Sequence, residues 1–207
     1  MTLSTLVVGT LEANCYVVGC PETRRGFVID PGGEPERILD QIESDELEIE
    51  YIFNTHGHVD HVAGNAAVRN ATGAKILIHD AERNAIQKPQ AFWASMVGGV
   101  EPSCPDETID EGDSCEIGTL TARICHTPGH SPGGVCIAVD DALFTGDTLF
   151  AGSVGRTDLP GGSNDALVRS LTRIMRDFSP RTRILPGHRG ASTLRKEALE
   201  NPYVQNL

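Results

Sequence analysis

Three histidines and an aspartate lie within six residues of one short stretch of the chain. Residues 54–64 read NTHGHVDHVAG and contain His56, His58, Asp60 and His61. Imidazole and carboxylate groups are common ligands of zinc, iron and manganese. A helix would turn His58 away from its neighbours, so we expect a strand end that turns into a helix. Because unpaired clustered polar groups add little to packing, a metal site is favoured over a polar surface turn.

Three further motifs place one ligand-type residue each at a strand end followed by a turn. TPGHSPG contains His130, FTGDTLF contains Asp147, and LPGHRG contains His188. Singly, each histidine would more often be a turn residue, but together they supply the ligands that the first cluster lacks. Two other histidines, His79 and His126, end apolar strands and are interpreted as structural.

The motifs THGHVDH, TPGHSPG, FTGD and LPGH, in this order, resemble those of the metallo-β-lactamase superfamily over nearly the whole chain. The resemblance implies an α/β fold, an αββα sandwich of two mixed sheets flanked by helices. It also implies a site for two divalent metal ions, with zinc expected first and iron or manganese as alternatives. Carried over, one ion would be held by His56, His58 and His130, the other by Asp60, His61 and His188, with Asp147 bridging both.

Two adjacent ions of this kind predict hydrolysis. A divalent pair lowers the pKa of a water between the ions, so that a bridging hydroxide forms near neutral pH, and it polarises a substrate oxygen. We expect Asp60 and Asp147 to act as catalytic carboxylates that hold this hydroxide in line for attack. The sequence offers no general acid beyond the ligands, which favours a thioester, since a thiolate leaves without a proton.

The segment TLFAGSVGRTDLPGGS, residues 148–163, narrows the expected substrate. It resembles the glyoxalase II-like (hydroxyacylglutathione hydrolase-like) short bacterial branch of the superfamily. That resemblance implies a small-molecule thioester such as S-lactoylglutathione. The chain after His188 is shorter than in full-length members, which leaves recognition of glutathione open. Arg156 either binds a substrate carboxylate or pairs with Asp158.

Three rival functions remain. A mononuclear iron persulfide dioxygenase also has a GRTD element and would use the positions of His56, His130 and Asp147. A β-lactamase is less favoured by the 148–163 segment. A non-enzymatic binding protein would be expected to have a closed, often cysteine-rich zinc site, whereas this ligand set is open.

Composition excludes several partners. The net charge is −12 and basic residues are scattered, which disfavours nucleic-acid binding. There is no basic amphipathic helix for a membrane surface, no signal-like N-terminus and no CxxC pair among the six cysteines. We expect one cytoplasmic domain over residues 1–207, as a monomer or small homo-oligomer.

Short apolar runs stopped by glycine or proline predict strands in two β-rich halves, each with its own helices. Such an order favours two packed sheets covered by helices. The helices are expected at 34–48, 63–73, 81–88, 164–178 and 192–201. Asn164 is the expected N-cap of the fourth. Residues 89–112 form an excursion with a short helix carrying Phe92, Trp93 and Met96, which either covers the site or packs its apolar face.

Overall fold

Apolar runs interrupted by turns form two six-stranded sheets in the computed structural model, which describes residues 1–205 and 207. The first sheet is antiparallel from β1 to β3 and parallel from β3 to β6. In spatial order it contains β1 (Thr2–Val8), β2 (Ala13–Gly19), β3 (Arg25–Ile29), β4 (Glu48–Phe53), β5 (Lys75–Ile78) and β6 (Glu107–Thr108).

The second sheet is also mixed, because only its β10–β13 pair is parallel. In spatial order it contains β14 (Ser192–Thr193), β13 (Arg183–Pro186), β10 (Ala142–Gly146), β9 (Val135–Val139), β8 (Leu120–His126) and β7 (Ser114–Ile117). A small two-stranded ribbon, β11 (Leu149–Phe150) with β12 (Ser153–Val154), follows β10.

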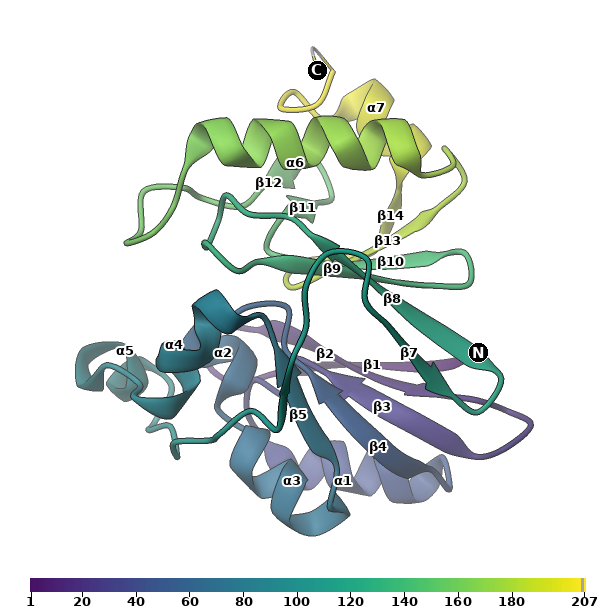
Figure 1. Cartoon of the computed structure of the whole chain (residues 1–207), viewed down its shortest axis with the longest axis vertical. Coiled ribbons are helices and arrows are strands. Elements are labelled where there is room, and N and C mark those ends of the chain that lie inside the picture. Colours follow the sequence, from purple (N-terminus) through teal and green to yellow (C-terminus); the bar gives the residue numbers. More distant parts are fainter. Residues whose placement is uncertain (206) are drawn as a thin grey trace.

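Helices cover the outer face of each sheet, so the predicted αββα sandwich is confirmed (Figure 1). Phe27 and Phe53 of the first sheet meet Phe144 of the second in the central core. Ile38 of α1 packs on the outside of the first sheet, and Leu171 of α6 on the outside of the second. The helices are α1 (Pro35–Ser44), α2 (Val59–Val62), α3 (Asn65–Thr72), the 3₁₀ turn η1 (Asp80–Glu82), α4 (Arg83–Gln87), α5 (Ala91–Met96), α6 (Asn164–Asp177) and α7 (Leu194–Glu200).

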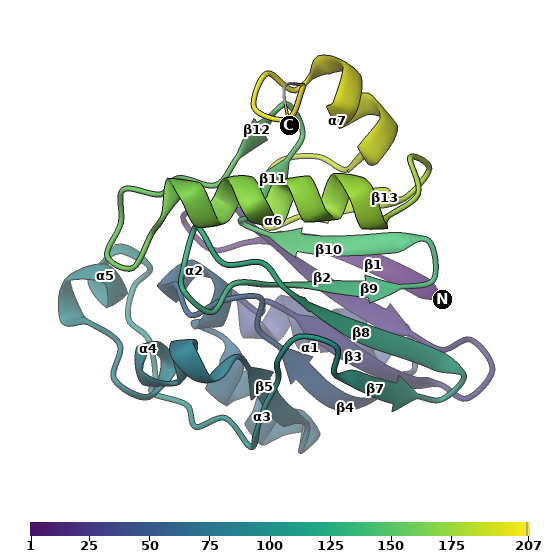
Figure 2. The same ribbon diagram turned by 45° about the horizontal axis from the view of Figure 1, so that its top comes forward.

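Strand ends gather the ligand-type motifs at one edge of the sandwich. The motifs follow the carboxyl ends of β4, β8, β10 and β13. In α/β sheets the carboxyl ends of strands are where loops meet to form binding sites. Helices α4 and α5 lie at this same end, close to the loop before α6 (Figure 2).

The expected N-cap of α6 is wrong by one residue. Ser163, not Asn164, caps the helix, because its side-chain oxygen accepts a hydrogen bond from the backbone N–H of Ala166. The six cysteines, all within the described part of the chain, are free. Among the residues described, no helix combines the length and apolar character that crossing a bilayer requires.

Candidate metal centre

The first group of ligand-type atoms comes from three histidines on two loops. His56 and His58 follow β4, and His130 lies in the turn after β8. His56 Nε2 lies 3.0 Å and His130 Nε2 2.9 Å from His58 Nδ1. Two nitrogens bound to one tetrahedral zinc at about 2.0–2.1 Å lie about 3.3 Å apart. The three nitrogens are therefore spaced closely enough to share one ion.

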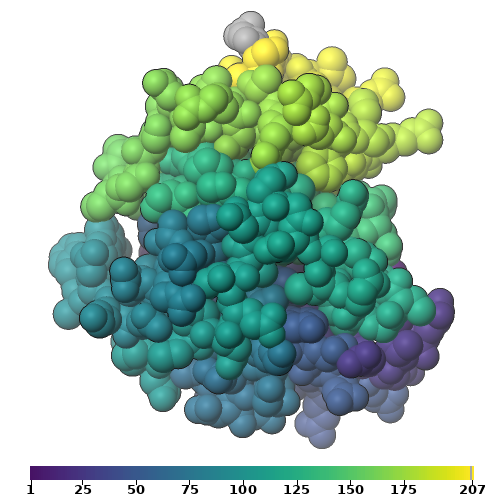
Figure 3. All heavy atoms as spheres, viewed as in Figure 1, coloured from purple at the N-terminus to yellow at the C-terminus, as the bar shows by residue number. Residues whose placement is uncertain are grey.

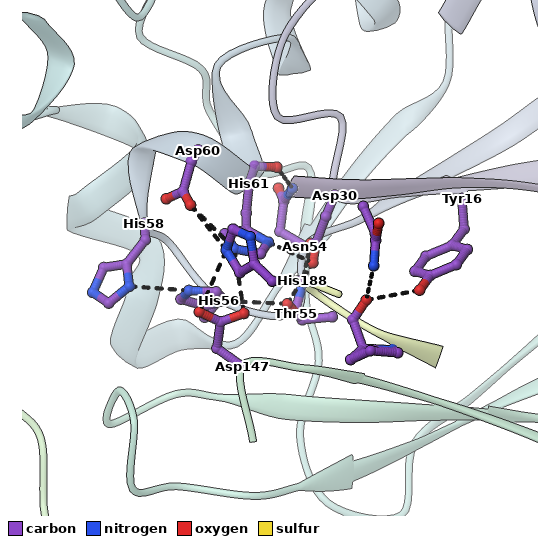
Figure 4. A network of polar contacts seen from close by, with 12 residues as sticks. Tyr16, Asp30, Asn54, Thr55, His56, His58, Asp60, His61, Asp147 and His188 are labelled. Carbon is purple, nitrogen blue, oxygen red and sulfur yellow. Dashed lines mark hydrogen bonds and ion pairs between the residues drawn. The ribbon is translucent and has the colours of Figure 1, made fainter. Parts of the chain in front are cut away.

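The second group combines Asp60, His61 and His188, which point toward one another in Figure 4. His188 Nε2 lies 3.2 Å and His61 Nε2 3.6 Å from Asp60 Oδ2. Helix α2 presents Asp60 and His61, and the turn after β13 presents His188. These atoms also lie close enough to share one ion.

Asp147 lies between the two groups. Its Oδ1 is 3.5 Å from His61 Nε2, and its Oδ2 is 3.5 Å from His130 Nε2. Gly155 permits this placement, because a Cβ there would come within 1.8 Å of the Asp147 carbonyl oxygen. One carboxylate thus faces a member of each group, and the structure brings all seven predicted ligand residues together.

Hydrogen bonds to atoms outside the groups orient the rings of three of these histidines. His130 Nδ1 donates to the carbonyl oxygen of Arg156 at 2.8 Å, and His188 Nδ1 donates to that of Glu12 at 3.2 Å. His61 Nδ1 donates to Asp30 at 3.0 Å. The Nε2 atoms of these three histidines then face the centre, which is how metal-binding histidines are oriented.

The electrostatics also suit cations. Burial, followed by the neighbouring histidines, lowers the pKa of His56 and lowers that of His58 to about 4, so both are neutral at neutral pH. Burial alone would lower the pKa of His61, but Asp147, Asp60 and Asp30 outweigh it and raise this pKa to about 10. Three carboxylates therefore favour positive charge where the second group converges.

Of the four buried side-chain atoms without a hydrogen-bond partner among the described residues, two belong to the ligand groups, His61 Nε2 and Asp147 Oδ1. Buried polar groups are normally paired, so this pair of orphaned atoms at the junction of two ligand groups needs an explanation. Divalent ions explain both, since imidazole nitrogens and carboxylate oxygens are their ordinary ligands. The residues present fit the metal pair that the fold implies.

Sequence reasoning missed Asp30, which stands behind this centre. Asp30 is 1% exposed and accepts hydrogen bonds from the Thr55 N–H at 2.7 Å, the Thr55 hydroxyl at 2.6 Å and His61. The Thr55 hydroxyl in turn accepts from His56 Nδ1 at 3.1 Å. One signal was present: Asp30 follows the apolar strand β3 and precedes Pro31-Gly32, like the other strand-end residues.

Glu82 was missed as well, and it joins the two loops that carry the first group. Its carboxylate accepts from the N–H of Gly57 at 3.2 Å and from that of Gly133 at 2.7 Å. Gly57 lies between His56 and His58, and Gly133 lies in the turn of His130. Nothing in the local sequence indicates these contacts, which depend on how η1 packs.

We expect Glu82→Ala to weaken binding of the first ion by about tenfold, because partners behind metal ligands orient them. It should also lower the melting temperature, since two buried N–H groups lose their acceptor. Chelator competition and thermal unfolding measure the two effects. Glu43→Ala, an exposed glutamate of α1, is the matched control. Unchanged metal affinity in Glu82→Ala would contradict this role.

Metal removal gives a second prediction. Dialysis against a chelator should lower the melting temperature by about 5–10 °C, because an ion at 100 times its Kd adds about 2.7 kcal/mol of stability. Added zinc should restore it. Differential scanning calorimetry with parallel metal analysis makes the measurement, and a melting temperature that stays constant while the metal is lost would contradict it.

The two histidines interpreted as structural lie outside both groups. The rings of His79 and His126 stack with centroids 4.3 Å apart and an interplanar angle of 10°. His79 Nδ1 accepts from the Ala81 N–H, so its Nε2 carries the proton and faces Asp110 at 3.4 Å. That nitrogen then has no lone pair for an ion, and it faces the Asp110 carboxylate instead.

A cavity of about 600 Å³ opens beside the centre. This volume is typical of small-molecule sites. His58, Asp60, His130 and Asp147 line it on one side, and Trp93 of α5 lines it on another. In Figure 3 the α5 atoms lie at the left edge, below the loop that precedes α6.

The short helix of the 89–112 excursion lines this cavity, and it buries none of its residues. The expectation that its apolar face simply packs is therefore wrong. Arg156 also lines the cavity, but its guanidinium forms a bidentate pair with Asp158 at 2.6 and 2.7 Å. Of the two interpretations of Arg156, the structure shows the pairing with Asp158.

An αββα sandwich with two His/Asp groups at one edge defines a class of metal-binding proteins. The family model of the metallo-beta-lactamase superfamily, most of whose members are hydrolases, matches residues 8–188, so the chain belongs to that superfamily. It is similar to hydroxyacylglutathione hydrolase GloC of Haemophilus influenzae, at 28% identity over 100% of this chain and 99% of the relative.

Solved structures share the fold over nearly the whole chain. TTHA1623 in a di-iron-bound form is 36% identical with a TM-score of 0.85, covering 98% of this chain and 100% of that one. BLEG-1 B3 metallo-beta-lactamase is 30% identical with a TM-score of 0.90, covering 98% and 99%. ETHE1 from Myxococcus xanthus is 27% identical with a TM-score of 0.84, covering 100% and 85%.

Proposed function

We propose that this protein is a dinuclear metal-dependent hydrolase that cleaves hydroxyacyl thioesters such as S-lactoylglutathione. The observation that supports it is the pair of ligand groups joined by Asp147 at the wall of an open cavity. Structural zinc sites are closed, whereas catalytic sites leave room for water and substrate. The likeness to GloC supports the same substrate class.

Seven residues would hold the ions, and two of these also face the substrate. His56, His58 and His130 would hold one ion, Asp60, His61 and His188 the other, with Asp147 shared. This site would thereby supply a water of lowered pKa and polarisation of the substrate's carbonyl oxygen. Asp60 and Asp147 border the cavity, so their carboxylates also orient the attacking water toward the substrate.

The remaining titratable side chains favour a thioester. Among the described residues that line the cavity, these are Glu82, Lys88 and Arg156. The Glu82 oxygens accept backbone N–H groups, and Arg156 is paired with Asp158. Neither of these two is free to donate a proton to a leaving group, and a thiolate needs none because its pKa is about 8.5.

A substrate panel tests the proposal. Metal-loaded protein is assayed for thiol release from S-lactoylglutathione, for hydrolysis of the matching oxygen ester, and for opening of a β-lactam. We expect the thioester to react at least about 100-fold faster than the oxygen ester, since the alkoxide leaving group of the ester needs a proton and a thiolate does not. Equal rates on both esters, or preference for the β-lactam, would contradict the proposal.

A second candidate is a mononuclear iron persulfide dioxygenase that uses His56, His130 and Asp147. Its support is the overlap with the ETHE1 chain and the 3.5 Å approach of Asp147 to His130. Oxygen uptake with glutathione persulfide by iron-loaded protein, without thiol release from the thioester, would favour this candidate over the hydrolase.

A further inference from the structure

The wall of the cavity formed by α5 is apolar and remains exposed. Trp93 and Met96 of α5, with Leu11 from the β1–β2 connection, line it, and Met96 is 45% exposed. The Thr10 hydroxyl donates to the carbonyl oxygen of Met96 at 2.9 Å, so the chain itself fixes α5 in place. An aromatic ring and a thioether at a cavity wall gain free energy by covering an apolar part of a ligand.

Two cationic side chains border the same cavity, and they differ in whether their charge is already paired. Arg156 is paired bidentately with Asp158. Lys88 ends α4, lines the cavity and has neither an ion-pair nor a side-chain hydrogen-bond partner within residues 1–205 and 207. Lys88 is therefore the cavity's uncompensated cation in this part of the chain.

The carboxylates that line the cavity do not neutralise Lys88. Asp60 and Asp147 lie among the candidate metal ligands, at 3.2 to 3.8 Å from His188 Nε2. Glu82 is buried, and its oxygens accept the N–H groups of Gly57 and Gly133. The positive charge of Lys88 thus stays available to a ligand in the cavity.

We propose that Lys88 binds an anionic group at the end of an apolar substrate arm, which packs along Trp93 and Met96 while the scissile bond lies at the metal centre. This rests on the proposed function and adds that, among thioesters, those whose arm carries an anion beyond an apolar stretch bind more tightly than those without it. It assigns recognition of the anion to Lys88 and not to Arg156, because the Arg156 guanidinium is already paired with Asp158.

Binding can be measured without turnover, because Trp93 is the chain's single tryptophan and lies in the cavity wall. Metal-loaded protein is titrated with 6-(methylthio)hexanoate and with 6-(methylthio)hexanamide, which share a shape and differ by one charge. Tryptophan fluorescence and calorimetry report binding. We expect the acid to bind about tenfold more tightly than the amide, with a preference that falls as salt rises.

Substitutions show which residue causes the preference for the acid over the amide. Lys88→Met should bring the affinity for the acid down to that for the amide, and Lys88→Glu should make the acid the weaker ligand. Lys196→Met, on α7 beside Glu200, is the control and should keep the preference. A wild-type protein that binds both ligands equally or neither overturns the inference, as does a preference that survives Lys88→Met and disappears in Arg156→Met.

The two proposals fail separately in this design. The thioethers are not hydrolysed, so their relative affinities stand or fall without reference to the reaction. A protein that hydrolyses no thioester would overturn the proposed function. The relative affinities for the acid and the amide would still test the role of Lys88.

Discussion

Asp147→Ala is expected to lower thiol release from a thioester by at least about 10³-fold and to leave fewer than two ions bound per chain. Asp147 lies between the two ligand groups, at 3.5 Å from His61 and from His130. Because it is the proposed shared ligand, its removal would withdraw a ligand from each ion and one negative charge from between them. Steady-state kinetics with metal analysis of the same preparation gives both numbers.

Asp141→Ala is the matched control for this variant. Asp141 precedes the same strand, β10, at its opposite end, where it pairs with Arg183 on the surface at 2.8 Å. Because exposed pairs contribute little, activity and metal content should stay unchanged. An Asp147→Ala protein that kept two ions and a rate within tenfold of wild type would contradict the assignment of Asp147.

Asp30→Asn is expected to weaken binding of the second ion by about 10–100-fold, with little change in packing. The amide of the new side chain would present N–H groups where Asp30 now accepts from Thr55 and from His61 Nδ1. To avoid two opposed donors, His61 would have to carry its proton on Nε2, which removes the lone pair from the metal centre. Competition with a chelator of known affinity measures each ion separately.

Asp45→Asn controls for the charge removed from Asp30. Asp45 also accepts side-chain hydrogen bonds, from Ser4 at 2.9 Å and Gln41 at 2.9 Å, but lies far from the centre, beyond α1. It should leave both metal affinities unchanged. If Asp30→Asn also bound both ions with wild-type affinity, the proton on His61 would not be controlled by Asp30.

The sequence predicted the layered fold because many of its short apolar runs stop at glycine or proline and its longer helices carry an apolar stripe. It also predicted which residues gather at the centre, since the seven ligand-type residues lie in four motifs that each follow a strand. The structure places these seven together, and their roles as ligands stay predictions. The wrong N-cap of α6 shows the limit of local patterns: Ser163 and Asn164 are both good caps, and only the backbone angles decide.

The contacts of the residues behind the centre could not be predicted, because they join distant segments of the chain. Asp30 accepts hydrogen bonds from Thr55 and His61, which lie 25 and 31 positions later in the chain. Glu82 accepts one from Gly133, which lies 51 positions later. The position of α5 at the cavity depends likewise on a bond to Thr10, 86 positions away. A strand-end pattern in one sequence carries no information about such pairings.

Anomalous diffraction at the metal absorption edge from crystals of metal-loaded protein tests the paired-ion site most directly. Two peaks are expected, one among His56, His58 and His130 and one among Asp60, His61 and His188, with Asp147 reaching both. A single peak, or strong peaks only at other places in the molecule, would contradict a shared two-ion centre.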